Sequence, residues 1–263
     1  MIDLCVVNFN TKPLLARLLD VLHEDDDGVS WKLYVADNGS TDGTFDWLHA
    51  NFERYRIETV IYGTNVGYAT ACNTLAAIGD SPFIGLLNAD VWLKTEDVKG
   101  IIRTFNEVEE AAIVGPKQRD ERGFVRHGGV FGSNTKPTFD GRWAKFDPTD
   151  ALYRDREEAL SVSGSAYFVR RSVWEALTND PDYQRVAPGA QGAFLPTPHY
   201  YEETWCSYFA RHRGYKVFYD GTVSIGHSWH RSSPVKGETD AIVMPKSRRM
   251  FRAACDQVGI ERE

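Results

Sequence analysis

The sequence predicts an α/β fold with a mostly parallel central sheet. Short apolar runs alternate with amphipathic stretches through the first half of the chain, and Gly- and Asp-rich turns separate them. Alternation of this kind is typical of strands that pair in parallel through helical connections. The chain has 263 residues, of which 42% are hydrophobic and 25% charged, so it can bury the core of one large domain.

The elements of the first half follow each other in a regular order. Apolar runs predict strands at residues 2–9, 31–37, 57–63 and 83–90. Helical periodicity, with a Thr cap and an early Pro in the first case, predicts helices at residues 11–24, 45–52 and 67–79. Ligands of such sheets bind beyond the C-terminal ends of the strands. The loops after Val7, Ala36 and Leu87 are therefore expected to line one crevice.

The second half has a different texture. Strands are predicted at residues 111–118, 163–171 and 215–221, and a helix at residues 202–214. Arg170 and Arg171 close one of these strands, and arginines at a strand end are expected to be solvated. Residues 179–199 are rich in Pro and Gly and predict a long loop, which in a compact domain is often functional.

Charge and cysteine content exclude some classes of protein. The formal net charge of −7 argues against a general nucleic-acid binder, although a basic cluster lies near the C-terminus at Lys246, Arg248, Arg249 and Arg252. The four cysteines are scattered, which favours reduced thiols. No signal peptide and no apolar stretch of about 18 residues is present. We expect no integral membrane segment and a cytoplasmic location, with a peripheral contact at the inner face of a membrane left open.

A polar triplet, Asn88-Ala89-Asp90, follows the apolar run of residues 83–87. Burying an unpaired carboxylate is costly, so the position of Asp90 needs an explanation. One interpretation is a strand-ending turn in which Asp90 caps the next helix. The other is a carboxylate at the end of a buried strand that binds a hard divalent cation together with substrate phosphates. The residues alone leave both open.

Six segments, in the order expected for the family, resemble the family 2 nucleotide-sugar glycosyltransferases. The rhamnosyltransferase-like branch is the most similar in its residue pattern. They read VVNFNT, YVADNGSTDGT, NVGYATACN, LLNADV, GSAYFVRRSVWE and YYEETWCSYFARHRGYKV. The resemblance implies a single GT-A domain over residues 1–230, with a Rossmann-like sheet flanked by helices. It divides this domain into a nucleotide-sugar-binding half, 1–115, and a mixed acceptor-binding and catalytic half, 116–230. Residues 231–263 would form a C-terminal extension packed on it.

The resemblance also implies a donor site. The residues that it assigns to the nucleotide sugar are Asn8, Asn10, Asp37, Asn38, Asn65, Gly67, Asn73, Asn88, Ala89 and Asp90. Asp37 can accept hydrogen bonds from a base N–H, and the helix after Gly67 would point its N-terminus toward the crevice, where anions are favoured. The alternative is that the turn after Asp37 only caps a helix and that Asn65 caps the next one.

A divalent cation, Mn²⁺ or Mg²⁺, is implied as cofactor. Asp90 takes the last position of the family's acidic metal motif, and Asn88 stands where a first carboxylate is common. His227 matches the place where such enzymes often supply a further metal ligand. A lone histidine is more often structural than a ligand, so both roles of His227 stay open.

The catalytic base is assigned to the acidic pair Glu202-Glu203. Glu203 falls at the family's second acid, and it would take the proton of the attacking hydroxyl, with Glu202 as the alternative base. Two acids in a first helical turn can instead serve only the helix dipole. Trp205 stands where the family has a further Asp, which is a departure from the pattern.

Acceptor-side residues are expected at Gly164 and Ser165, which match the small residues of a family strand below the acceptor. In the loop of residues 179–199, the side chains assigned to acceptor contact are Tyr183, Arg185, Gln191 and Phe194.

The predicted reaction is transfer of a sugar from a nucleotide-diphosphate donor to a hydroxyl of a glycan or other acceptor, with inversion and metal assistance. A sugar nucleotidyltransferase is an alternative, but it would carry a glycine in the phosphate loop after the first strand, and VVNFNTKPLL has none. A non-catalytic carbohydrate-binding protein is the other, and it would not need Asp90 and Glu203. The donor sugar, the acceptor and the oligomeric state do not follow from the sequence.

Overall fold

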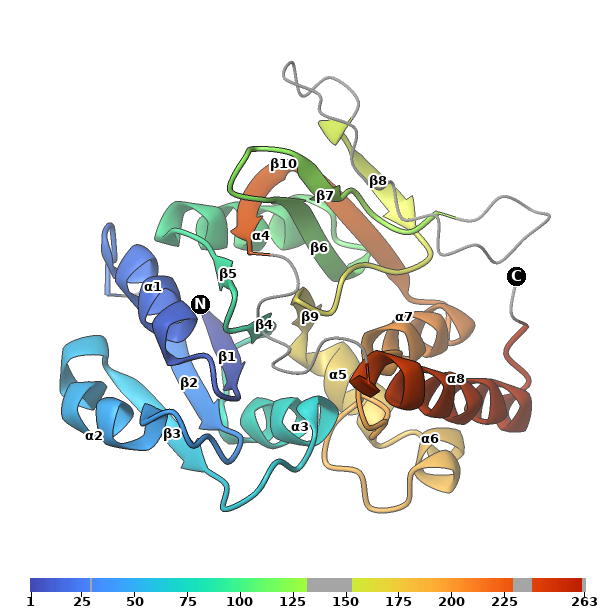
Figure 1. The fold of residues 1–263 in the computed structure, drawn as a ribbon. Helices are drawn as coiled ribbons and strands as arrows, with labels where there is room; N and C mark the ends of the chain where they lie inside the picture. The colour runs from blue at the N-terminus through green and yellow to red at the C-terminus, as the bar shows by residue number, and fades with distance from the viewer. Residues whose placement is uncertain (29, 132–152, 229–237, 262–263) are drawn as a thin grey trace.

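The computed structural model describes residues 1–28, 30–131, 153–228 and 238–261, and its strands form one mixed sheet (Figure 1). The strands are β1 (Ile2–Asn8), β2 (Trp31–Asp37), β3 (Ile57–Ile61), β4 (Phe83–Asn88), β5 (Val91–Trp92), β6 (Ala111–Arg119), β7 (Val125–His127), β8 (Arg156–Ala159), β9 (Ala166–Arg170) and β10 (Lys216–His227). The helices are α1 (Lys12–His23), α2 (Thr44–Tyr55), α3 (Tyr68–Ile78), α4 (Thr95–Glu107), α5 (Arg171–Thr178), α6 (Pro181–Val186), α7 (Glu202–His212) and α8 (Glu238–Val258).

The order of strands along the sheet is β3-β2-β1-β4-β9-β6-β10-β5, with β7 added to β6 and β8 added to β10. Strands β3, β2, β1 and β4 are all parallel, as the alternation of strand and helix predicted. Strand β9 runs antiparallel to both β4 and β6, whereas β10 runs parallel to β6. The prediction of a parallel first half and a mixed second half is confirmed.

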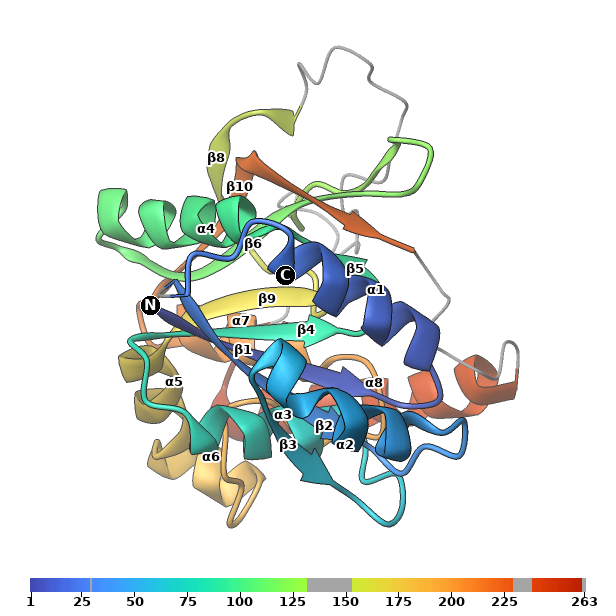
Figure 2. The same cartoon turned by 90° about the vertical axis from the view of Figure 1, so that its left-hand side faces the viewer.

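Helices cover both faces of the sheet (Figures 1 and 2). Successive side chains of a strand point to opposite faces. In β1, Cys5 and Val7 therefore join the apolar cluster formed with α3, α5, α6, α7 and α8, whereas Leu4 and Val6 join the cluster formed with α1, α2 and α4. Burial on both faces explains why the β1 sequence is nearly continuous in apolar residues.

The expectation that Arg170 and Arg171 are solvated is wrong. The Arg171 guanidinium lies 2.6 Å from the Asp3 carboxylate, which is fully buried, and it also donates to the carbonyl oxygens of Ser81 and Ala76 at 2.6 and 2.8 Å. Arg170 donates to backbone carbonyl groups at and after the end of α4. A buried carboxylate needs a charged and hydrogen-bonded partner, and here that partner is distant in sequence.

The segment 179–199 is not the continuous loop that its composition predicted, because α6 lies within it. Tyr183 and Phe194 have no exposed surface and belong to the core, so their assignment to acceptor contact is wrong. Burying a large aromatic side chain in the core stabilises the fold, and the Pro and Gly content of a segment does not show whether its aromatic residues are buried. Arg185 and Gln191 are exposed, and their assignment stays a prediction.

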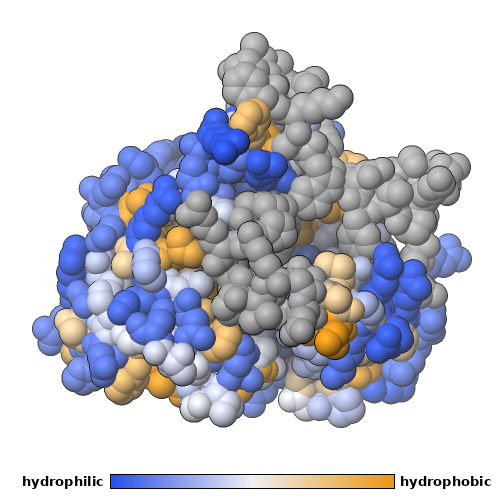
Figure 3. Space-filling model, in the orientation of Figure 1, coloured by the Kyte–Doolittle hydropathy of each residue, from blue (hydrophilic) through white to orange (hydrophobic). Residues whose placement is uncertain are grey.

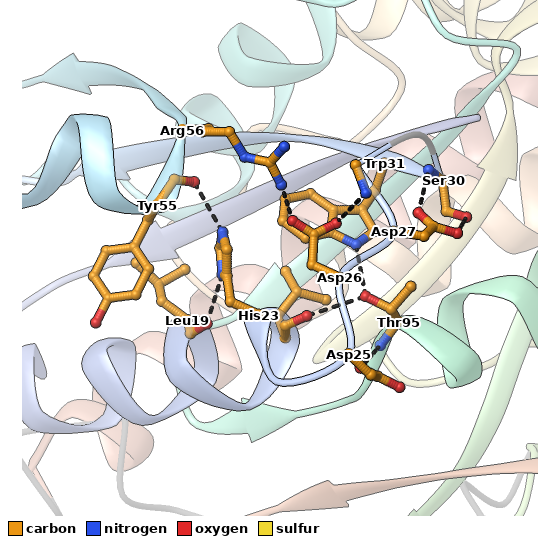
Figure 4. A network of polar contacts seen from close by, with 12 residues as sticks. Leu19, His23, Asp25, Asp26, Asp27, Ser30, Trp31, Tyr55, Arg56 and Thr95 are labelled. Carbon is orange, nitrogen blue, oxygen red and sulfur yellow. Dashed lines mark hydrogen bonds and ion pairs between the residues drawn. The ribbon is translucent and has the colours of Figure 1, made fainter.

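A network of polar contacts surrounds the N-terminal end of β2 (Figure 4). The ring nitrogens of His23 lie 2.7 and 3.1 Å from the carbonyl oxygens of Leu19 and Tyr55, and the ring packs edge-on against Trp31. The Trp31 indole donates to the Thr95 hydroxyl at 3.0 Å, which joins β2 to α4. These contacts tie together α1, α2 and α4 on one side of the sheet.

The C-terminal helix α8 packs against α6 and α7. The ring of Phe251 stacks on Tyr201 with 5.4 Å between centroids and meets Tyr208 edge-on. The division of the chain into a domain and a C-terminal extension stays a prediction, and residues 231–237 and 262–263 of that extension lie outside the described part of the chain.

The visible surface shows hydrophobic residues in small groups between hydrophilic ones (Figure 3). Among the described residues, no helix combines the length and the apolar character needed to cross a bilayer. All four cysteines are buried and free of disulfides, as predicted.

Candidate active site

Three loops meet at one edge of the sheet, as the strand pattern predicted. In the register of the parallel strands, Asn8 at the end of β1 lies opposite Asp37 at the end of β2, and Val7 lies opposite Asn88 at the end of β4. The Asp37 carboxylate is 2% exposed and accepts a hydrogen bond of 3.1 Å from the backbone N–H of Ser40. The predicted donor-site residues at these three strand ends are therefore neighbours.

The amides of the first loop are used mainly by the loops themselves. Asn8 donates to the hydroxyls of Ser40 and Thr44 at 3.2 and 3.1 Å. Asn10, with a φ of 54°, accepts from the backbone N–H of Thr41 at 2.7 Å. These side chains join the loop after β1 to the loop after β2, which fixes the shape of the edge before any ligand binds.

A second amide pair joins the loop after β2 to the loop before α3. Asn38 donates to Asn65 at 3.0 Å and accepts from the backbone of Val66 at 2.9 Å, and Asn65 accepts from the backbone of Gly67 at 2.9 Å. Gly39 has a φ of 80°, and a Cβ there would stand 2.7 Å from the backbone of residue 64. The close backbone approach in this turn is thus between two loops of the chain.

The Asp90 carboxylate and the His227 ring face each other. The short ladder between β5 and β10 places His227 opposite Val91, and the backbone of Ser228 donates to the Asp90 carbonyl at 2.8 Å. The distance between His227 Nε2 and Asp90 Oδ1 is 3.3 Å, and the two residues are 6% and 1% exposed. The predicted metal ligands are therefore brought together across 137 positions of sequence, the difference between 227 and 90.

This pair fits a shared divalent cation. Two ligand atoms that lie about 2.1 Å from an octahedral cation, at a right angle, are about 3 Å apart, which is close to the separation found here. Within the described part of the chain, no group of three or more His, Cys, Asp or Glu side chains could hold a metal. His230, near His227 in sequence, lies outside the described residues.

Polar side chains from β6, β7 and the segment just before β9 form a hydrogen-bonded cluster next to this pair. Gln118 Oε1 accepts from His227 Nδ1 at 3.0 Å and from the Ser165 hydroxyl at 2.9 Å. The Ser165 and Ser163 hydroxyls are 2.8 Å apart, and the Ser163 backbone donates to His127 Nε2 at 3.0 Å. Burial, together with the nearby His227, lowers the pKa of His127 to about 4, so this ring is neutral at pH 7.

Glu203 lies directly on Gly164. A Cβ at Gly164 would stand 3.0 Å from Glu203 Cγ, so a larger residue there would displace the carboxylate. The Tyr68 hydroxyl donates to the Gly164 carbonyl at 2.9 Å, and the neighbouring Ser165 carbonyl accepts from the backbone of Asn88 at 2.9 Å. The structure thus brings the predicted base, the predicted acceptor-side residues and the end of β4 into one place.

The backbone before α7 is strained. Tyr200 and Tyr201 both have a φ of 70°, a left-handed conformation that costs non-glycine residues of order 1–3 kcal/mol each. The Thr197 hydroxyl donates to the Tyr200 carbonyl at 2.9 Å, and the Tyr201 ring is stacked on Phe251. These contacts hold the turn that starts α7, and the start of α7 decides where Glu202 and Glu203 point.

Burial raises the pKa of both glutamates. Burial, reinforced by the negative charge of Glu203, raises the pKa of the Glu202 carboxyl to about 8. The Thr197 hydroxyl donates to Glu202 Oε2 at 3.2 Å, which offsets part of this rise. Burial also raises the pKa of Glu203. Because Glu203 is partly exposed and Glu202 is not, Glu203 is the one that ionises first.

Asn73 lies apart from the strand ends. Its amide donates to the Phe194 carbonyl at 2.9 Å and accepts from the Phe194 backbone N–H at 3.2 Å, and the side chain is 5% exposed. Both polar atoms of this side chain thus anchor the segment between α6 and α7. Its assignment to the donor site is not supported by these contacts.

The sequence matches the model of one protein family, described as glycosyl transferase family 2, over residues 3–177. The match covers more than half of the chain. The chain belongs to glycosyl transferase family 2. A comparison with curated proteins finds no match.

Solved structures of similar fold include several glycosyltransferases. TarS 1–349 of S. aureus matches with a TM-score of 0.63 and 12% identity, covering 98% of this chain and 65% of that one. Mannosyltransferase PcManGT of Pyrobaculum calidifontis, in complex with GDP-Man and Mn²⁺, matches with a TM-score of 0.61 and 15% identity, covering 95% and 64%. GalNAc-T7 with UDP, GalNAc and Mn²⁺ matches with a TM-score of 0.65 and 11% identity, covering 97% and 47%. The family 2 chain has the GT-A fold of these proteins and spans 65% or less of their length.

Two residues of this family 2 site were missed by reasoning from the sequence. Gln118 is the last residue of the apolar run 111–118, and only its place at a strand end hints at a role. Tyr68 opens α3, next to the predicted Gly67, and reads as an ordinary amphipathic position. Both matter through partners 40 or more positions away, which local patterns do not report.

The raised pKa of Glu202 predicts a pH-dependent stability of the family 2 domain. The unfolded carboxyl loses its proton near pH 4.5, whereas the folded one keeps it up to about pH 8. The contribution of this proton is therefore complete at low pH and is lost between these values, at about 1.4 kcal/mol per pH unit. Glu202→Gln, which cannot ionise, is expected to melt above the wild type by more at pH 8 than at pH 5. Thermal denaturation of both proteins across this pH range measures the difference in Tm. An equal difference in Tm at pH 5 and pH 8 would contradict the raised pKa of Glu202.

Proposed function

We propose that the chain transfers a sugar from a nucleotide-diphosphate donor to a hydroxyl of an acceptor, with inversion at the anomeric carbon and with a divalent cation. One observation carries the proposal. The two residues just before β9 join the predicted base to the predicted metal ligands. Gly164 packs against Glu203, and Ser165 is hydrogen-bonded to Gln118, which contacts His227 opposite Asp90.

On the donor side, Asp90 and His227 would hold Mn²⁺ or Mg²⁺. When bound, the cation would offset the charge of the leaving diphosphate as a Lewis acid. Asp37 would accept from a base N–H through the oxygen that does not bind Ser40. The loops around Asn8 and Asn38 are already bonded to each other, so they would bind the nucleotide with little ordering cost.

On the acceptor side, Glu203 would accept the hydroxyl proton as the oxygen attacks the anomeric carbon. Its raised pKa makes it a better base than an ordinary carboxylate, while Glu202 stays protonated and adds no competing charge. A single displacement of this kind inverts the sugar. It needs no enzyme nucleophile, and the four thiols of the chain are all buried.

The proposal is tested by thermal denaturation with UDP, GDP, dTDP, CDP and ADP, each with and without Mn²⁺. Because a ligand stabilises the folded state that binds it, one diphosphate at 100 times its Kd adds about 2.7 kcal/mol. For a chain of this size that corresponds to a rise in Tm of about 5–10 °C. We expect the rise only when nucleotide and Mn²⁺ are both present. If no nucleotide gives a Mn²⁺-dependent rise, the proposed donor site is wrong.

The finer assignments stay predictions. They are the rhamnosyltransferase-like branch, the glycan or other hydroxyl-bearing acceptor, and a cytoplasmic location with a peripheral membrane contact. A product assay uses nucleotide sugars that carry the base found in the thermal screen. It separates sugar transfer from the two alternatives, a sugar nucleotidyltransferase and a non-catalytic carbohydrate-binding protein. A nucleotidyltransferase would release pyrophosphate or nucleoside triphosphate, and a carbohydrate-binding protein would release nothing.

A further inference from the structure

Gln118 accepts two hydrogen bonds at the centre of the candidate site and is itself fully buried. Its Oε1 lies 3.0 Å from His227 Nδ1 and 2.9 Å from the Ser165 hydroxyl. Strand β6 places it there, because Gln118 is paired with His127 of β7 on one side and with Ile225 of β10 on the other. One amide thus contacts both the predicted metal ligand and the acceptor-side strand.

The first contact determines the tautomer of His227. An amide oxygen can only accept, so the contact requires the proton on Nδ1. In the neutral ring, Nε2 then carries the lone pair, and Nε2 is the atom that faces Asp90 at 3.3 Å. A histidine that binds a metal commonly donates its other N–H to an oxygen in this way, which orients the ring and strengthens it as a ligand.

The nitrogen of the Gln118 amide shows that stability alone does not explain this residue. Gln118 Nε2 is buried and has no hydrogen-bond partner among the described residues. A buried donor without a partner typically costs about 1–3 kcal/mol. A methionine of similar shape would avoid that cost, so a glutamine here is better explained by what its oxygen holds in place.

The second contact of Oε1 reaches the acceptor side. Ser165 follows Gly164, the residue on which Glu203 lies, and the Ser165 hydroxyl is also 2.8 Å from that of Ser163. Movement of the Gln118 amide would therefore disturb both the His227 ring and the start of β9.

We propose that Gln118 is a positioning residue that holds His227 in the Nδ1–H tautomer, so that Nε2 is the nitrogen that would bind the cation, and that fixes the segment leading into β9. This proposal rests on the proposed function for the cation, but the tautomer of His227 can be tested without it. The opposite orientation of the amide would donate to Nδ1 and leave a proton on Nε2, which could then not bind a metal.

Two variants separate these orientations. Gln118→Glu keeps the shape and replaces the N–H₂ donor by a second oxygen, so as a carboxylate it can only accept and preserves the proposed arrangement. Gln118→Met keeps the approximate shape and removes both hydrogen bonds. We expect Gln118→Met to weaken binding of Mn²⁺ by about 10–100-fold, the usual effect of losing an outer-shell partner. Gln118→Glu should retain Mn²⁺ binding within a few-fold. Gln257→Met, at an exposed position of α8, is the matched control and should change nothing.

Binding is measured by titrating Mn²⁺ in the presence of the nucleoside diphosphate that gives the largest thermal shift, with Tm recorded for every variant. The tautomer is read separately from the ¹⁵N chemical shifts of His227 in metal-free protein, assigned with His227→Gln. The proposal expects a protonated Nδ1 in wild type and in Gln118→Glu, and a shift toward protonated Nε2 in Gln118→Met. Loss of Mn²⁺ binding in Gln118→Glu, or a wild-type ring protonated on Nε2, would overturn it. If wild type binds no Mn²⁺ but shows the expected tautomer, the proposed function fails and the positioning role stands.

Discussion

Replacing Glu203 by Gln is expected to lower turnover by about 10²–10⁴-fold, the usual contribution of a positioned general base. This corresponds to about 3–5 kcal/mol of activation free energy. Gln has the size of Glu and preserves the packing on Gly164, so the fold and the donor side should be unaffected. The measurement is release of nucleoside diphosphate from the donor sugar, together with the Mn²⁺-dependent thermal shift. We expect the rate to fall and the thermal shift to stay.

Glu202→Gln is the informative comparison for this variant. Because burial and the charge of Glu203 keep Glu202 protonated at neutral pH, an amide resembles its native state. Its turnover should stay within about tenfold of wild type, a difference of about 1.4 kcal/mol. The reverse pattern, with Glu202→Gln inactive and Glu203→Gln active, would make Glu202 the base. Glu175→Gln, at an exposed position of α5, is the control for the negative charge that Glu203→Gln removes.

Full activity in Glu203→Gln would instead favour a structural role for the pair, in which the two acids only stabilise the N-terminus of α7 through the helix dipole. The strain before this helix argues against that interpretation. A pair needed only for the dipole would work from any well-capped start, whereas here two tyrosines are held in the left-handed region just before the pair. Strain of this kind persists where the surrounding contacts enforce it, and it is concentrated at functional sites.

The sequence was sufficient for the fold because periodicity is a local property. Strands β1 to β4 and helices α1 to α3 could each be recognised from their own residues, whereas β5 and α4 were not predicted. The parallel order then determined which loops meet. The same reasoning placed Asn8, Asp37 and Asn88 at one edge of the sheet, as the register confirms. The mixed second half followed mainly from the family resemblance, since its strands are separated by long irregular segments.

Pairings between distant segments could not be predicted in the same way. The buried pair of Asp3 and Arg171 spans 168 positions, and each residue alone looks like an ordinary surface charge. The amides of Asn38 and Asn65 were assigned to a ligand, yet their polar atoms bond to each other and to the loop backbone. Polar residues at a ligand site and polar residues that shape its loops have the same composition. Only their partners distinguish them.

The second large effect concerns Asp90, for which the sequence left two roles open. If the carboxylate holds a cation, Asp90→Asn should abolish the Mn²⁺-dependent rise in Tm, or weaken Mn²⁺ by more than the 10–100-fold typical of an outer-shell residue. Without metal, the variant should be about as stable as wild type, because Asn has the size of Asp and fits the same site, which is 1% exposed. Thermal denaturation with the best nucleotide, over a Mn²⁺ titration, measures both quantities.

A capping role predicts the opposite combination. Asp97, seven positions further along, is the residue that does cap α4, since its carboxylate accepts from the Lys94 backbone at 2.9 Å. Asp97→Ala should therefore destabilise the fold by about 0.5–2 kcal/mol and leave the Mn²⁺ response intact. Asp90→Asn is expected to lose the metal response, and Asp97→Ala is expected to lose stability. If Asp90→Asn keeps the Mn²⁺ response and loses stability as Asp97→Ala does, then Asp90 is a structural turn residue, and the cation must be held elsewhere or not at all.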